Sequence, residues 1–400
     1  GRGVARSSFE LGATLKDCRR GFELRQVSAT DAQDWAVQEG ALQHRSRGFF
    51  SVNGVAYGAE HCVLLYQPQA AVTGLMSTRV QGERWFLLQG RAEPGCLGEA
   101  QFGPTLQSTP ANYLRMHGGA TTPYVNAFLA FDPQIDVLQD TTQLDLGERY
   151  LAKCKRSLLV EAHAPSPPLV GFVWATPQAL AEAVLQSAFL NIDLRSILAI
   201  APWSSWHESG ELTPQSTAVR RSLSASLRPE VLGELLTQLQ CTAPMLPHFV
   251  PLEELKNWRR TAMGWMEREP RQGFAVEFYH VKAALREVAA WIQPLLNSSS
   301  EGRVILACRE RNSVLEYFVR PVVERGSLGR AALAPSFLRY PGAQGEPPEW
   351  MTGAKAEVLS ATTESDEGGR FHRDSSMHQV VRVSDTVDTE PCDGVWLRLS

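Results

Sequence analysis

The chain has 400 residues, which predicts two to three domains at about 150 residues per domain. Hydrophobic residues make up 44% and charged residues 20%, a composition that excludes a disordered or fibrous protein. The formal net charge of −4, with both signs interspersed, gives no indication of a nucleic-acid partner or of an anionic membrane surface.

The first 20 residues read as a basic N-terminal extension without the apolar core of a secretory signal. Nowhere does an apolar run approach the roughly 18 residues of a membrane span. The seven cysteines are scattered, without a CxxC pair, which indicates reduced thiols. These features predict a cytoplasmic protein with no membrane partner.

Short motifs recur in the same order about 225 residues apart. Gly48-Phe49-Phe50 matches Gly273-Phe274-Ala275, the segment 66–68 matches 292–294, and 137–150 matches 358–371. We interpret this as an internal duplication of a β-rich α+β unit, with the two copies packed as an intramolecular pair. The predicted organisation is an N-terminal extension (1–20), a first repeat (21–180), a helical linker (181–245) and a second repeat (246–400).

Within the repeats most of the periodicity is typical of strands, as in residues 84–95, 157–163, 303–310 and 314–326. Residues 281–292 also fit a helix, but the duplication favours a strand with a bend. Trp35, Trp258 and Trp291 are expected in the core.

Thr176-Pro177 is a helix start, with Thr as N-cap and Pro in the first turn, and the helix is expected to reach Leu190. A polar connector rich in Ser and Pro is expected after Trp203, followed by a short helix over 231–240.

The first polar segment is Glu93-Pro94-Gly95 followed by residues 103–113. Its hydroxyl, amide and phenol groups suit a hydrogen-bonding wall for a polar ligand. A loop bounded by prolines, in which Ser, Thr and Asn bond their own backbone, is the alternative.

The second polar segment, residues 143–150, is followed by Lys153, Lys155 and Arg156, and its counterpart is 364–373. Carboxylates beside Arg, Lys and His could transfer protons and hold a diphosphate. The alternative, which a charge run alone favours, is a solvated charged turn. In residues 191–196, Asp193 and Arg195 could form a structural pair, or Arg195 could reach a phosphate. His117, beside two glycines, is either a base on a loop or a turn residue.

The motifs EPG, GPTLQSTPANY, HGG, VLQDTTQ and NIDLRSILA together resemble the NDP-hexose 2,3-dehydratase family across nearly the whole chain. The family acts on dTDP-4-keto-6-deoxyglucose in antibiotic deoxysugar pathways. The resemblance implies two tandem Nudix-like domains and a homodimer. The Gly-led, magnesium-binding Nudix box is absent from the sequence, and so are phosphate-cradling and dinucleotide motifs, so neither cofactor nor metal is expected.

The chemistry that the resemblance implies is an elimination. The C4 ketone acidifies the C3 proton, a base removes it, and the enolate expels the C2 hydroxyl with help from an acid. The candidate catalytic residues are Glu93, His117, Asp145, Glu148, Glu364, Glu367 and His372. The candidate substrate-binding residues are Gln107, Ser108, Asn112, Tyr113, Gln143, Lys153, Lys155, Arg156, Asp193, Arg195 and Arg370.

The sequence departs from the family pattern at several positions. Leu146 replaces an acidic residue, Ser157 replaces an Asn, and the second repeat has lost its polar wall at 334–338. Two alternatives therefore stay open: a diverged member catalysing another elimination, isomerisation or cyclisation, and a non-catalytic ligand-binding protein.

Overall fold

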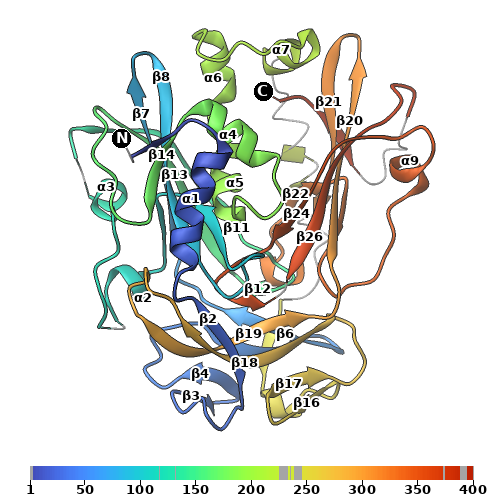
Figure 1. Cartoon of the computed structure of the whole chain (residues 1–400). Helices are drawn as coiled ribbons and strands as arrows, with labels where there is room; N and C mark the ends of the chain where they lie inside the picture. Colours follow the sequence, from blue (N-terminus) through green and yellow to red (C-terminus); the bar gives the residue numbers. More distant parts are fainter. Residues whose placement is uncertain are drawn as a thin grey trace.

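The computed structural model describes residues 3–116, 118–130, 132–224, 233–234, 236–237, 246–372, 374–387 and 394–399. Within these ranges the protein is a mixed α+β structure with four sheets and short helices (Figure 1). Two larger sheets stand side by side above two smaller ones in the view of Figure 1.

The first large sheet has the order β1-β14-β8-β7-β13-β11, with β9 paired to β8 and β10 paired to β7. Apolar residues of its long strands, such as Leu75 and Leu88, are completely buried and pack against α1 (Ser8–Arg19) and the helices that follow β14. The strands are β1 (Val4–Ala5), β7 (Ala71–Val80), β8 (Glu83–Ala92), β9 (Ala100–Gly103), β10 (Leu106–Ser108), β11 (Ile135–Leu144), β13 (Cys154–Ala162) and β14 (Phe172–Ala175).

The second large sheet has the order β22-β21-β20-β26-β24, with β23 paired to β20 and β27 paired to β21. Its strands β27, β21, β20, β26 and β24 lie in the same order as β14, β8, β7, β13 and β11 of the first large sheet. The last strand of each series, β11 and β24, contains a bulge. Its strands are β20 (Gly302–Arg311), β21 (Val314–Val322), β22 (Ala332–Pro335), β23 (Phe337–Arg339), β24 (Glu357–Ser365), β26 (Ser375–Arg382) and β27 (Val395–Leu397).

The two smaller sheets exchange strands between the N-terminal and C-terminal halves. In one sheet, β15 from the C-terminal half pairs with β5; in the other, β2 from the N-terminal half pairs with β18. The first contains β3 (Trp35–Gln38), β4 (Ala41–His44), β5 (Ser51–Tyr57), β6 (Glu60–Tyr66), β12 (Tyr150–Leu151) and β15 (His248–Val250). The second contains β2 (Glu23–Val27), β16 (Trp258–Arg260), β17 (Gly264–Glu267), β18 (Phe274–Lys282), β19 (Ala290–Ser298) and β25 (Phe371–His372).

The register of these small sheets corrects one of the sequence matches. β12 sets Tyr150 beside Leu65, and β25 sets Phe371 beside Leu296, so Leu65 and Leu296 occupy equivalent places. The match of residues 66–68 to 292–294 is therefore wrong. The error arises because the two connections differ in length: residues 283–289 join β18 to β19, whereas residues 58–59 join β5 to β6. The strand with a bend expected over 281–292 is wrong, because β18 ends at Lys282, residues 283–289 form a connection, and β19 begins at Ala290 as the antiparallel partner of β18.

The helices follow the caps that the sequence contains, with two differences. Thr176 caps α4 (Pro177–Val184) as predicted, but this helix ends before Leu190, and α5 (Ile192–Ala199) begins separately with Asn191 as its N-cap. The expected polar connector instead forms α6 (Trp203–Glu208) and α7 (Thr217–Leu223), because Trp206 and Leu223 are buried. The remaining helices are α1 (Ser8–Arg19), α2 (Pro110–Tyr113), α3 (Asn126–Leu129), α9 (Glu349–Thr352), η1 (Leu252–Glu254) and η2 (Arg325–Ser327). Most of the helix expected over 231–240 lies outside the described residues.

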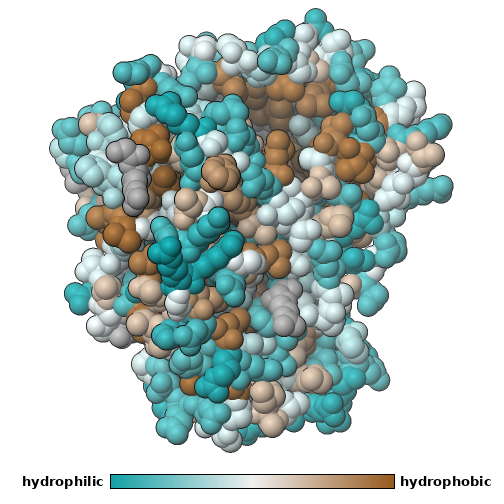
Figure 2. Space-filling model, viewed as in Figure 1, coloured by the Kyte–Doolittle hydropathy of each residue, from teal (hydrophilic) through white to brown (hydrophobic). Residues whose placement is uncertain are grey.

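Hydrophilic residues cover most of the lower part of the face in Figure 2, whereas hydrophobic residues gather higher up, around the places that Figure 1 labels α6, β20 and β21. No helix in the described part of the chain is long and apolar enough to cross a membrane.

Candidate active site

Two adjoining cavities lie where the N-terminal and C-terminal halves meet. We call the larger one, of about 420 Å³, the outer chamber, and the smaller one, of about 60 Å³, the inner chamber. They adjoin because five residues line both: Glu93, Asn112, Arg286, Gly369 and Arg370. A site shared by both halves cannot form from either half alone.

Four charged side chains of alternating sign form a row beside the inner chamber. Lys153 Nζ lies 3.2 Å from Asp145 Oδ2, Lys155 Nζ lies 3.2 Å from Asp145 Oδ1, and Lys155 also lies 2.7 Å from Asp193 Oδ1. Lys153, Lys155 and Asp193 line the chamber, whereas Asp145 lies behind the two lysines. Each charge is thereby paired although it is withdrawn from water, which is the condition for burying it.

The two lysines of this row titrate in opposite directions. Burial lowers the pKa of Lys153 below its usual value, although Asp145 opposes the shift. Burial acts on Lys155 in the same direction, but Asp145 and Asp193 outweigh it and raise the pKa of Lys155. Lys153 is therefore suited to giving up a proton, and Lys155 to remaining a cation. The same two lysines hold Asp145 ionised: burial alone would raise its pKa, but Lys155 and Lys153 lower it.

Glu93 follows β8 and is clamped by two arginines. Its Oε1 accepts hydrogen bonds from Arg91 at 2.8 Å and from Arg286 at 2.5 Å. Burial alone would raise the pKa of Glu93, but the two arginines lower it to about 2, so the carboxylate stays ionised. Its Oε2 is buried and has no hydrogen-bond partner within the described part of the chain, which leaves an acceptor for a ligand hydroxyl.

Glu367 faces the inner chamber from the turn between β24 and β25. Its Oε2 accepts a hydrogen bond from the Tyr150 hydroxyl at 2.5 Å, and its Oε1 accepts one from the Gly369 N–H at 2.8 Å. Gly368, in the same turn, lies so close to Glu93 that a Cβ there would sit 2.6 Å from Glu93 Oε2. Glycine at this position therefore lets the two carboxylates line one chamber.

The polar wall expected from residues 103–113 is part of the inner chamber. Gln107 and Ser108 come from β10, and Asn112 comes from α2. Asn191 donates to Gln107 Oε1 at 2.9 Å while its own Oδ1 caps α5. This double contact fixes α5 against β10, so that Asp193 in the first turn of α5 reaches Lys155.

Aromatic rings line the outer chamber. Trp35 and Phe50 pack at 5.0 Å between ring centroids, and the Arg370 guanidinium lies 4.4 Å from the centroid of Phe50. Trp291, expected in the core, is half-buried and lines this chamber, whereas Trp35 and Trp258 are buried as predicted. An aromatic cavity next to buried cations suits a planar ring that carries an anionic group.

Several candidate residues lie away from both chambers. Glu148 pairs with Arg325, Glu364 with Arg195, and Arg156 with Asp140, each at 2.6–2.8 Å. Each of these charges is matched by a neighbour that also lies outside both chambers. Arg195 also donates to the carbonyls of Val184 and Leu190. Three others are held elsewhere: Gln143 accepts from Ser157, Tyr113 packs beside a hydrophobic cluster, and His372 stacks on Tyr279 at 4.5 Å. His117 lies outside the described residues.

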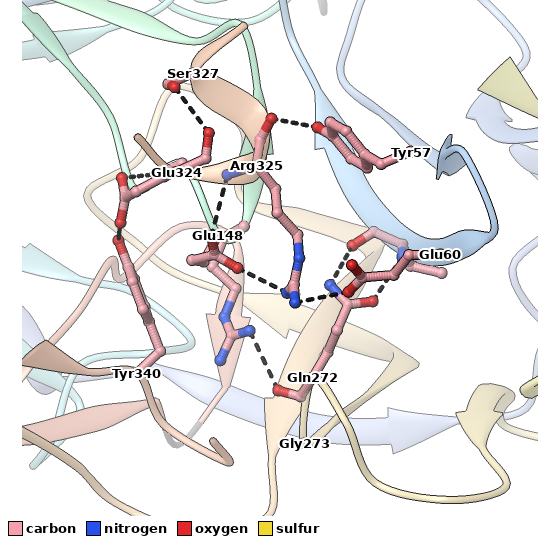
Figure 3. A network of polar contacts seen from close by, with 12 residues as sticks. Tyr57, Glu60, Glu148, Gln272, Gly273, Glu324, Arg325, Ser327 and Tyr340 are labelled. Carbon is pink, nitrogen blue, oxygen red and sulfur yellow. Dashed lines mark hydrogen bonds and ion pairs between the residues drawn. The ribbon is translucent and has the colours of Figure 1, made fainter. Parts of the chain in front are cut away.

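Glu324 lies at the place in the second large sheet's topology that corresponds to Glu93, and the polar side chains around it, which we call the counterpart network, bond one another (Figure 3). The Gly95 N–H donates to the Gly368 carbonyl at 2.9 Å, and the Gly326 N–H donates to the Gly147 carbonyl at 2.7 Å, so the two surroundings match. Around Glu324, however, the Tyr340 hydroxyl donates to the carboxylate. Glu148 and Arg325 complete the network. No residue of this network lines either chamber.

The counterpart also differs in charge, because Asp374 stands where the first site has Lys153. Asp374 is buried, accepts from the Ser298 N–H at 3.0 Å, and lies 3.9 Å from Arg149. Burial raises the pKa of Asp374 from 3.8 to about 7. Between these two values the folded chain holds a proton that the unfolded chain has released, so Asp374 makes the free energy of unfolding fall as pH rises.

Replacing Asp374 with Asn is expected to remove this pH dependence. Relative to the unmodified protein, the free energy of unfolding of the variant rises by about 2–3 kcal/mol between pH 5 and 7, at 1.36 kcal/mol per pKa unit. Denaturant unfolding at several pH values measures the difference. The exposed Asp385→Asn variant is the control, and parallel curves for Asp374→Asn and the unmodified protein would contradict the expectation.

Arg286 and Trp291 are the main site residues that sequence reasoning missed. Arg286 lies in the long connection between β18 and β19 and reaches Glu93 of the other half. The longer connection between β18 and β19 is visible in the sequence as extra residues. The mistaken match of residues 66–68 to 292–294 concealed these residues. Among the described residues, no group of three or more His, Cys, Asp or Glu side chains is placed to hold a metal ion.

A chamber with paired buried charges beside an aromatic cavity is typical of an enzyme for a small charged substrate. The chain belongs to the NDP-hexose 2,3-dehydratase family, whose profile matches residues 13–201 and 232–400.

Two curated relatives are both named dTDP-4-dehydro-6-deoxy-alpha-D-glucopyranose 2,3-dehydratase. The one from Saccharopolyspora spinosa is 28% identical, over 94% of this chain and 83% of its own length. The one from Streptomyces violaceoruber is 27% identical, over 94% of this chain and 87% of its own. A solved structure described as an ADP compounds hydrolase covers 48% of this chain and 96% of its own, with 12% identity and a TM-score of 0.27, too low to bear on the fold.

Proposed function

We propose that this protein removes water across C2 and C3 of a nucleotide-linked 4-keto-6-deoxyhexose, dTDP-4-keto-6-deoxyglucose. Membership of the dehydratase family supports the reaction class. The observation that carries the assignment is the pairing of a carboxylate, Glu367, with a lysine of lowered pKa, Lys153, at one small polar chamber. An elimination needs such a base and such an acid.

The two chambers suggest how the substrate lies. The thymine ring stacks in the outer chamber against Trp35, Phe50 and Trp291. Arg286 and Arg370 line both chambers, so they meet the diphosphate at the junction. The sugar then enters the inner chamber, where Gln107, Asn112 and the free Oε2 of Glu93 bind its hydroxyls.

The proton transfers follow from this placement. Glu367 takes the C3 proton as the C3–H bond breaks, and the electron pair moves toward the C4 oxygen, where Lys155 stabilises the negative charge. The enolate then expels the C2 hydroxyl, to which Lys153 gives a proton, so that water leaves. The resulting enol relaxes to the 3,4-diketo-2,6-dideoxy sugar.

Glu93, expected among the catalytic residues, is assigned here to binding instead. A carboxylate with a pKa of about 2 is a weak base, and both arginines would have to be displaced before it could accept a proton. Glu93 holds Arg286 in place and offers Oε2 to the sugar.

The departures from the family pattern lie outside the chambers, which favours dehydration over the diverged alternatives. Leu146 packs beside a hydrophobic cluster that includes Tyr150 and Phe371. Ser157 lies within hydrogen-bond distance of Thr73 and donates to Gln143. The altered segment 334–338 belongs to β22 and β23 near the counterpart network.

We also propose that the chain is an internally duplicated pair of Nudix-like units joined by a helical linker. The identical strand order of the two large sheets and the reciprocal exchange of β2 and β15 support the duplication. The cytoplasmic location and the homodimer implied by the family resemblance are part of the same proposal.

Incubation of the protein with dTDP-4-keto-6-deoxyglucose tests the proposed reaction. Mass spectrometry is expected to detect loss of one water molecule from the sugar nucleotide. If the substrate is recovered unchanged by a folded protein that binds dTDP, the proposed reaction is wrong.

Because the polar side chains around Glu324 bond one another, one molecule of dTDP is expected to bind per chain. Arg370→Ala is expected to weaken binding about 10- to 100-fold, since a hydrogen bond between charged groups contributes about 1.5–3 kcal/mol. Arg325→Ala, in the counterpart network, is the matched control and leaves binding unchanged. Calorimetric titration measures both, and two equivalent sites per chain would contradict the account.

A further inference from the structure

We propose that Tyr150 is a positioning residue. It fixes the base Glu367 and the acid Lys153 in place relative to each other at the inner chamber. This inference rests on the proposed function, because it concerns how that chemistry is set up. Tyr150 lines neither chamber, so it acts through the two residues that do.

Tyr150 contacts both groups with different parts of one side chain. Its hydroxyl donates to Glu367 Oε2 at 2.5 Å, and Lys153 Nζ lies 3.7 Å from the centroid of its ring. The hydroxyl thus binds the carboxylate of one half of the chain, while the ring face binds the ammonium group of the other half. One rigid ring therefore links base and acid.

The surroundings fix this ring in place. Tyr150 is completely buried in a hydrophobic cluster, and its ring meets that of Phe371 edge-on, at 5.8 Å between centroids. β12, which carries it, pairs with β6, while Phe371 in β25 pairs with β19. The ring is thus held between the two small sheets.

Tyr150 stays a hydrogen-bond donor throughout the working pH range. Burial, and then the charges of Glu367 and Asp145, raise the pKa of its hydroxyl well above the usual value. A hydroxyl that does not ionise cannot exchange protons with substrate. Its contribution is to orient the Glu367 carboxyl group through this hydrogen bond.

Tyr150→Phe removes the hydroxyl but keeps the ring under Lys153. We expect kcat to fall about 10- to 100-fold, the range for losing a hydrogen bond to a charged group, while KM changes less than about threefold. Rates of water loss at several substrate concentrations give kcat and KM separately.

The matched control is Tyr57→Phe, which removes a hydroxyl that donates to the Arg325 carbonyl outside the chambers. This variant is expected to leave kcat and KM unchanged. If Tyr150→Phe binds dTDP normally but keeps its kcat, the positioning role is wrong. If the unmodified protein shows no water loss, the proposed function fails instead. An equal rise in KM with kcat intact would also overturn the positioning role.

Discussion

Replacing Glu367 with Gln is expected to lower kcat by about 10³-fold, within the range by which a positioned acid or base accelerates a reaction. The variant has nearly the same side-chain volume. Its amide oxygen can accept from the Gly369 N–H while its NH2 group donates to the Tyr150 oxygen, so the fold and dTDP affinity remain. Rates of water loss by mass spectrometry, together with titration of dTDP, separate catalysis from binding.

Glu364→Gln provides the matched control for that experiment. Glu364 is equally buried and lies three residues away in the chain, but it pairs with Arg195 and lines neither chamber. It is expected to retain kcat within a few-fold. If Glu367→Gln remains as active as the unmodified protein, or if Glu364→Gln is the inactive one, the base has been assigned to the wrong carboxylate.

The second large effect concerns stability. Glu93→Ala is expected to lower the free energy of unfolding by about 3–5 kcal/mol, because it leaves Arg91 and Arg286 in a buried site without their carboxylate. Since Arg286 crosses from the other half of the chain, the contact between the halves weakens as well. Thermal and denaturant unfolding measure the loss.

The comparison for Glu93 is Glu39→Ala, which removes an ion pair with Arg47 in which both side chains are exposed. An exposed pair contributes at most about 1 kcal/mol. Equal stabilities for Glu93→Ala and Glu39→Ala would show that the buried cluster does not hold the halves together.

The polar wall of the site could be predicted because its residues are close in the chain. Gln107, Ser108 and Asn112 follow one another on β10 and α2, and hydrogen-bonding side chains gathered in one segment tend to face one ligand. Lys153 and Lys155 could be predicted as a pair for a similar reason, because alternate residues of an extended segment point to the same face.

The partners of the candidate charges could not be predicted, because pairing depends on distances across the fold. Glu148 and Glu367 occupy comparable turns, yet Arg325 neutralises the first while Tyr150 presents the second to the chamber. Nothing local distinguishes them. Arg195 shows the same limit, since Glu364 lies far away in the sequence.

The fold class followed from strand periodicity and turn residues, but the exchange of β2 and β15 did not. Edge strands of three to five residues carry little periodicity, and their pairing partner is decided by which sheet edge is open. Each of these strands belongs to one proposed repeat but pairs with a strand of the other. The division between residues 245 and 246 therefore divides the sequence, whereas both small sheets contain strands from the two sides of it.

The most direct test of the central claim is turnover of dTDP-4-keto-6-deoxyglucose carrying deuterium at C3. The account predicts that the deuterium is lost together with the C2 hydroxyl, and that turnover of the labelled substrate is slower if the C3 proton transfer limits the rate. A product that retains the deuterium at C3 would contradict removal of that proton, and with it the elimination proposed for the inner chamber.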